Sequence, residues 1–121
     1  MTTRLNPTLV VKVRKQVQDW NNELLNPWHP SLAAKQLAQG LRNSCPKMAE
    51  ALESAQILEP FAEMLHDQVL ELKLANREAG MAPSEAESEA RKELIPSGPE
   101  MEEEWLEANS LPTVPEELAT A

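Results

Sequence analysis

The chain has 121 residues with 20 acidic and 11 basic side chains, which gives a net charge of −9. This length allows one small domain with a modest core. A single cysteine excludes an intrachain disulfide, and the apolar run of Leu9, Val10 and Val11 is too short for a signal peptide or a membrane span. We therefore expect a cytoplasmic protein that does not contact a membrane.

The composition predicts an all-α fold. Leu and Ala are abundant, whereas the chain has no Tyr, one Phe and only three Gly, so runs that favour β-strands are missing. We expect a small bundle of about four helices, then a short fifth helix and an acidic, partly disordered tail. The corresponding segments are residues 1–80, 81–99 and 100–121.

Asn6 and Pro7 predict the start of the first helix, over residues 7–25. Its apolar residues alternate in steps of three and four, and they are Val10, Val13, Val17, Trp20 and Leu24. This spacing is typical of an amphipathic core helix, and the alternative is a short seam between two copies of the chain.

A proline-containing turn at 26–30 separates this helix from the next, and we expect Trp28 to cap the core there. Pro30 is expected to open the second helix, which continues to residue 43. The third helix is predicted over 46–58, with Cys45 as its cap. The helix dipole could lower the thiol pKa of Cys45, and the alternative is an inert, partly buried thiol.

Basic residues gather in the first part of the chain. Residues 1–47 carry seven bases and two acids, 7 − 2 = +5, whereas residues 48–121 carry four bases and eighteen acids, 4 − 18 = −14. The helices over 31–52 resemble a helix-turn-helix only weakly, because Glu50 and Glu53 would repel phosphates. If this part binds nucleic acid, the contacts would come from Lys12, Arg14, Lys15, Lys35, Arg42 and Lys47.

The longest predicted helix covers 59–80, with Pro60 in its first turn and Gly80 just past its end. Its core side is expected to contain Leu58, Phe61, Ala62, Met64, Leu65, Val69, Leu72 and Ala75. Leu70 and Leu74 lie on the opposite side beside Asp67 and Glu71, so they would face water unless another surface covers them. We predict that these two leucines bind another protein or pair two copies of the chain.

After Gly80 the apolar content falls. Ser84 and Glu87 have the capping-box spacing and predict a short helix to residue 94, and the segment 95–99 reads as a linker. The acidic tail contains three apolar residues that could share one side of a helix, Met101, Trp105 and Leu106. They predict a docking helix for a partner, and the alternative is a disordered, solubilising tail.

Signs of catalysis are absent from the sequence. His29, His66 and Cys45 fall in three different segments without the spacing of metal ligands or of a nucleophile and its base. The glycines are isolated, so no phosphate-binding loop is present. We expect no enzymatic activity, no catalytic residues, no metal and no cofactor.

The sequence therefore favours a non-catalytic protein that binds another protein, as an adaptor, an assembly factor or a subunit of a larger complex. Two alternatives stay open. The first is a DNA-binding regulator with a basic head and an acidic partner-binding tail. The second is an inhibitor whose acidic surface imitates nucleic acid.

Overall fold

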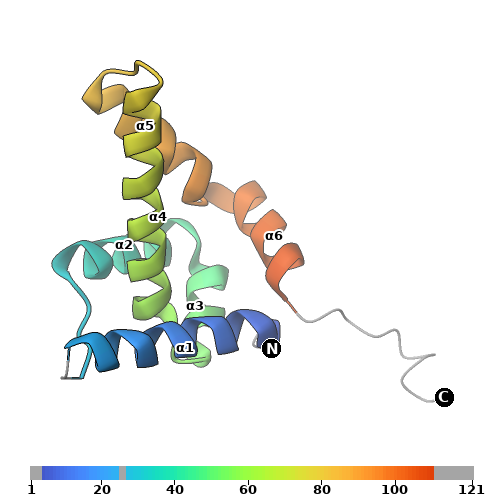
Figure 1. Ribbon diagram of the computed structural model, residues 1–121. Coiled ribbons are helices and arrows are strands. Elements are labelled where there is room, and N and C mark those ends of the chain that lie inside the picture. The colour runs from blue at the N-terminus through green and yellow to red at the C-terminus, as the bar shows by residue number, and fades with distance from the viewer. Residues whose placement is uncertain (1–3, 25–26, 111–121) are drawn as a thin grey trace, which may run out of the picture.

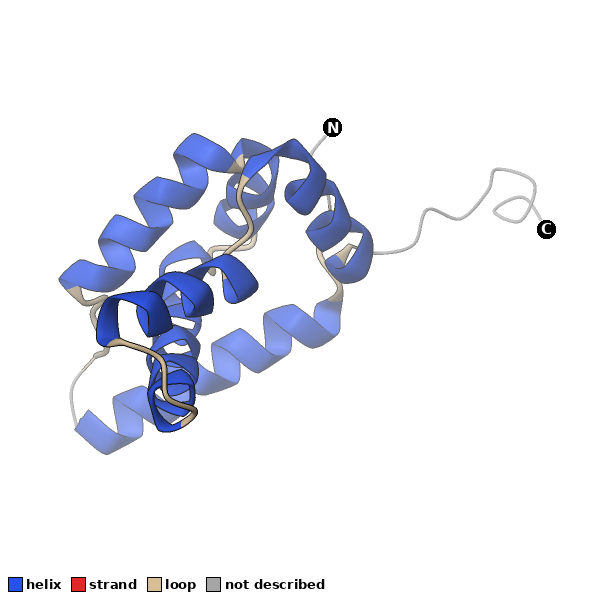
Figure 2. Cartoon of the chain, turned by 90° about the horizontal axis from the view of Figure 1, so that it is seen from above, coloured by secondary structure: helices blue, strands red, loops and turns tan. Residues whose placement is uncertain are grey.

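The computed structural model describes residues 4–24 and 27–110, and within them it is entirely helical apart from one isolated β-bridge (Figures 1 and 2). This confirms the predicted all-α class, whereas the number of bundle helices and the acidic tail stay predictions. The six helices are α1 (Pro7–Leu24), α2 (Leu32–Ser44), α3 (Pro46–Ser54), α4 (Leu58–Glu78), α5 (Pro83–Leu94) and α6 (Gly98–Asn109).

Helix α1 begins as its sequence predicts, because the side-chain oxygen of Asn6 accepts the backbone N–H of Thr8 at 2.9 Å. Of the five apolar residues expected along one side, only Val13 is fully buried. At the far end of α1, the ring of Trp20 stacks on that of Trp28 with centroids 5.0 Å apart. Trp28 is half-buried in this stack, and its role as a cap of the core stays a prediction.

Helix α2 begins two residues later than predicted, at Leu32, with Ser31 as its cap. The Ser31 hydroxyl oxygen accepts the N–H of Ala34 at 3.1 Å, and the same hydroxyl donates to Glu63 of α4 at 2.6 Å. The prediction that Pro30 opens this helix is wrong, because the serine can supply a side-chain acceptor that proline lacks.

Helix α3 is shorter than predicted. It ends at Ser54, and the chain then turns through Gln56, whose φ of 62° lies in the left-handed region. The predicted helix over 46–58 is therefore interrupted. Its last residue, Leu58, is the first residue of α4.

Helix α4 is the upright element against which α1, α2, α3 and α5 pack, whereas α6 packs on α3 (Figure 1). Its buried residues are Leu58, Ala62, Leu65 and Val69, which all belong to the predicted core side. Ala75 is exposed, so the buried side ends before the last turn. Gly80 has a φ of 104° just past the helix, as its position predicts.

Helix α5 folds back along the upper half of α4, where Ala86 and Ala90 are fully buried (Figure 1). The predicted capping box is wrong, because Pro83 is the first helical residue and Ala82 the cap. Ser84 is therefore already inside the helix. Proline at the first position costs no hydrogen bond, so it fixes the start of this helix.

The predicted linker is short and packed. Pro96 is buried, and α6 already begins at Gly98. Helix α6 then descends towards the N-terminal end of α1 (Figure 1). The division of the chain into residues 1–80, 81–99 and 100–121 stays a prediction, and residues 111–121 of the expected tail lie outside the described residues.

Candidate protein-interaction surfaces

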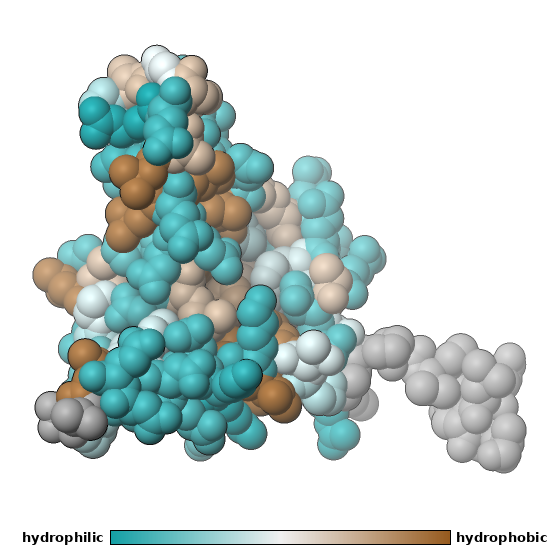
Figure 3. Space-filling view, in the orientation of Figure 1, coloured by the Kyte–Doolittle hydropathy of each residue, from teal (hydrophilic) through white to brown (hydrophobic). Residues whose placement is uncertain are grey.

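Leu70 and Leu74 lie on the upper half of α4, where their exposed fractions are 43% and 62%. Hydrophobic residues are visible at the surface on this part of the molecule, bordered by hydrophilic ones (Figure 3). The two leucines are one helical turn apart and thus share one side of α4. Their exposure agrees with the spacing in the sequence, and their use as a contact surface stays a prediction.

The exposure of these leucines follows from how α5 covers α4. Lys73 forms an ion pair with Glu87 of α5 at 3.9 Å, and the side-chain amide of Asn76 donates to the carbonyl oxygen of Ala86 at 3.1 Å. Both contacts lie on the side of α4 that faces α5. A single neighbouring helix covers only one side of the upper half of α4, so the opposite side stays open to solvent.

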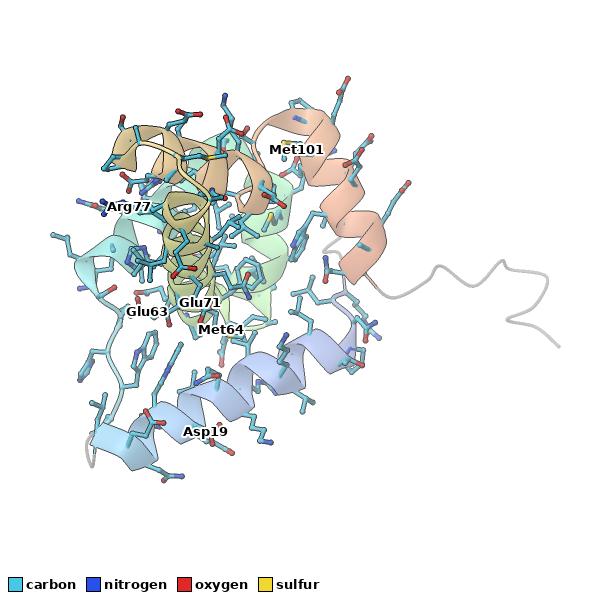
Figure 4. The ribbon with its side chains drawn as sticks, turned by 45° about the horizontal axis from the view of Figure 1, so that its top comes forward. Asp19, Glu63, Met64, Glu71, Arg77 and Met101 are labelled. Carbon is cyan, nitrogen blue, oxygen red and sulfur yellow. The ribbon has the colours of Figure 1, made fainter. Side chains whose placement is uncertain are left out.

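Acidic residues border the leucines on the open side. We call Asp67, Leu70, Glu71, Leu74 and Glu78 the exposed stripe of α4, and all five are exposed. Glu71 and Glu63 lie along this helix, with Arg77 near its end (Figure 4). Partial burial, followed by the negative charge of Glu63, raises the pKa of Asp67 above its ordinary value.

The predicted docking residues of α6, Met101, Trp105 and Leu106, are half-buried. The ring of Trp105 meets that of Phe61 of α4 edge to face, with centroids 5.7 Å apart and planes at 78°. Trp105 is also packed against the buried core. The side chain of Trp105 therefore already packs against other residues of its own chain.

Glu102 is a structural residue that the sequence analysis missed. Only 6% of it is exposed, and its carboxylate accepts the backbone N–H groups of Lys47 at 2.8 Å and of Met48 at 3.1 Å. These N–H groups belong to the first turn of α3, which has no partner for them within the helix. In the sequence Glu102 looks like its neighbours in an acidic run, and no local signal distinguishes it.

The other end of α6 is joined to the N-terminal segment. The N–H of Asn6 donates to the carbonyl oxygen of Asn109 at 2.7 Å, and Leu5 forms the isolated β-bridge with Ser110. Helix α6 is therefore held at its first turn by α3, in its middle by Phe61 and at its end by the residues before α1.

Cys45 does not have the reactive environment that its position at a helix start suggested. It is fully buried, and its thiol donates to the carbonyl oxygen of Pro96 at 3.5 Å. Burial raises the pKa of this thiol, and the negative charge of Glu102 raises it further. The effect is opposite to the dipole-lowered pKa considered above, because burial of the thiol raises its pKa most and the carboxylate of Glu102 at the N-terminus of α3 adds to it.

The basic side chains proposed for nucleic acid are spread over three helices. Lys12, Arg14, Lys15, Lys35 and Lys47 are exposed, but Arg42 forms an ion pair with Glu53 at 2.9 Å. That pair occupies the guanidinium of Arg42, and it would have to open before Arg42 could bind a phosphate. Nucleic-acid binding stays a prediction.

A cleft of about 290 Å³ lies between α2, α4 and the end of α5, and its lining includes His66, Arg91 and Ser44. The Ser44 hydroxyl donates to the carbonyl oxygen of Gly40 at 2.9 Å and is thus already engaged. Within residues 4–24 and 27–110, no group of three or more His, Cys, Asp or Glu side chains could hold a metal ion. No helix in the described part of the chain is long and apolar enough to cross a membrane.

The comparisons with known proteins give no further assignment. The chain matches no known protein family, and no curated protein or solved structure is similar enough to match it.

Proposed function

We propose that this chain is a non-catalytic protein that binds another protein, as an adaptor, an assembly factor or a subunit of a larger complex in the cytoplasm. The observation that carries the proposal is the exposure of Leu70 and Leu74 at 43% and 62%. In this proposal α1 to α4 form the scaffold bundle, α5 supports the upper half of α4, and α6 carries the docking residues of the acidic tail, residues 100–121.

The two leucines still have apolar area to bury. Burying a fully exposed leucine contributes about 1.5 to 3 kcal/mol, and with 43% and 62% exposed, Leu70 and Leu74 can each supply roughly half of that to a protein–protein binding energy. Scattered apolar side chains are normal on a protein surface, but these two are adjacent and held on a supported helix. A partner could therefore bind them without any rearrangement of the bundle.

Helix α6 offers a second contact through Met101, Trp105 and Leu106. Because Trp105 already packs against Phe61, a partner that uses this tryptophan must either reach its exposed part or displace α6. Displacement would break the contacts of Glu102 and Asn109 as well. The stripe on α4 is thus the more accessible of the two surfaces.

The test is the double variant Leu70→Lys, Leu74→Lys. We expect its helicity and thermal unfolding to match the wild type, because both side chains already face solvent, while capture of the native partner is lost. The matched control is Leu32→Lys, since Leu32 is 71% exposed at the start of α2. Equal capture by all three proteins would refute the proposal, and unfolding of the double variant would place the leucines in the core.

A further inference from the structure

We propose that the exposed stripe of α4 binds a basic amphipathic helix of a partner protein. This inference rests on the function proposed above and adds the chemistry of the partner.

The stripe presents two parallel rows. Leu70 and Leu74 are four residues apart and form the apolar row. Asp67, Glu71 and Glu78 lie beside it at spacings of four and seven, which keeps them on the same side of the helix. A helix with leucine-sized side chains on one edge and lysine or arginine on the other would match both rows at once.

The acids of the stripe form no ion pair within the described chain, although the nearby charge of His66 offsets part of the raised pKa of Asp67. Ion pairs there join Arg42 to Glu53, Lys73 and Arg91 to Glu87, and Lys92 to Glu89, so none includes Asp67, Glu71 or Glu78. Glu63, further down α4, is occupied by the N–H and the hydroxyl of Ser31. Arg77 is exposed near the end of the helix (Figure 4), three residues after Leu74, and it borders the leucines on the edge away from the acids of the stripe. Three carboxylates are therefore available to a cationic partner.

The same charges disfavour pairing of two copies through this stripe. An antiparallel two-fold contact would bring the acids of one stripe against those of the other, and such like-charge contacts oppose association. The raised pKa of Asp67 agrees with this, because part of that shift comes from the negative charges of Glu63 and Glu71. The charges thus favour a basic partner over an antiparallel pair of copies.

The probe is a synthetic peptide of about 18 residues, long enough to form a helix on binding, with leucines on one side and lysines on the other. We would titrate it into the full chain by calorimetry at low and moderate salt. The key variant is Asp67→Lys, Glu71→Lys. Its matched control is Glu103→Lys, Glu107→Lys on α6. This control makes an equal change of charge at two exposed acids that are also four residues apart.

We expect the stripe variant to weaken binding of the Leu/Lys peptide by about tenfold or more, while the α6 control stays within about threefold of the wild type. A Leu/Glu peptide should show the reverse preference and bind the stripe variant best. Equal losses in the two charge variants would mean that only the net charge attracts the peptide, which overturns the proposal. Failure of the wild type to bind the Leu/Lys peptide would overturn it as well.

Two further measurements separate this inference from the proposed function. Suppose that the double variant Leu70→Lys, Leu74→Lys no longer captures the native partner, whereas Asp67→Lys, Glu71→Lys still does. The proposed protein-binding function would then hold, and the inference that the partner is basic would be wrong. If sedimentation shows wild-type self-association that the leucine variant abolishes, the stripe binds a second copy, which also overturns this inference.

Discussion

The carboxylate of Glu102 accepts the backbone N–H of Met48 at 3.1 Å, across 54 positions of the chain. It accepts the N–H of Lys47 as well, so a residue of α6 caps the first turn of α3. Capping usually comes from a side chain just before the helix, but Cys45 makes no such hydrogen bond. The capping of α3 therefore depends on the position of α6.

We expect Glu102→Ala to lower the free energy of unfolding by about 1 to 3 kcal/mol, because two buried N–H groups lose their acceptor. Glu102→Gln should cost less, since the amide oxygen can still accept. Glu103→Ala is the control on the same helix and should change stability by about 0.5 kcal/mol or less, because Glu103 is exposed. Urea denaturation gives all three values, and equal effects of the two alanine variants would contradict the capping role.

The contact between Phe61 and Trp105 gives a second prediction. Trp105→Ala should cost about 1 to 3 kcal/mol of stability, because the ring is half-buried against the core. In a double-mutant cycle with Phe61→Ala, we expect a coupling energy of about 0.5 to 1.5 kcal/mol from the edge-to-face geometry.

The control for this cycle pairs Trp105→Ala with Leu32→Ala, an exposed residue of α2, and these effects should add. Chemical denaturation followed by circular dichroism measures every variant in the same way. A coupling energy near zero for Phe61 and Trp105 would mean that the rings do not stabilise the docking of α6.

Several features of the fold were predictable because their causes are local. Asn6 and Pro7 fix the start of α1, Gly80 fixes the end of α4, and the helical period alone places Leu70 and Leu74 on the open side. Each of these signals involves residues within two turns of one another. The existence of the helices and the exposed leucines could therefore be read from the sequence.

Other features depend on distant residues and left no local trace. Glu102 looks like any other acid of its run, and only the packing of α6 against α3 makes it a cap. In one place, two local signals predicted different starts for the same helix. At the start of α5, Pro83 prevailed over the capping-box pattern of Ser84 and Glu87, and Glu87 pairs with Lys73 of α4 instead.

Cys45 should react slowly despite its place before a helix. The thiol is fully buried and its pKa is raised, so at neutral pH almost no thiolate is present or accessible. We expect alkylation of the native protein to be at least about 100-fold slower than in denaturant, because reaction requires local opening. Mass spectrometry of timed samples measures both rates. Faster reaction in the native state would restore the prediction of a reactive thiol.

The last prediction concerns the pH dependence that Asp67 causes. Its pKa is raised in the folded protein, so the folded state binds the proton more tightly than the unfolded state does. The contribution of Asp67 to stability is therefore most favourable at acidic pH, and it is lost as pH rises through the folded pKa. At neutral pH the ionised carboxylate destabilises the fold.

We accordingly expect Asp67→Asn to stabilise the protein at pH 7, by roughly 0.5 kcal/mol or less because the side chain is exposed and screened. The gain should shrink towards zero in acid, where the wild-type carboxyl is protonated in both states. Asp19→Asn is the control, since Asp19 lies on the basic helix α1, four residues after Lys15. We expect this substitution to leave the stability of the fold unchanged or to lower it slightly. Denaturation of the three proteins across the acidic range decides the matter, because a gain for Asp67→Asn that is equal at every pH could not come from the carboxylate.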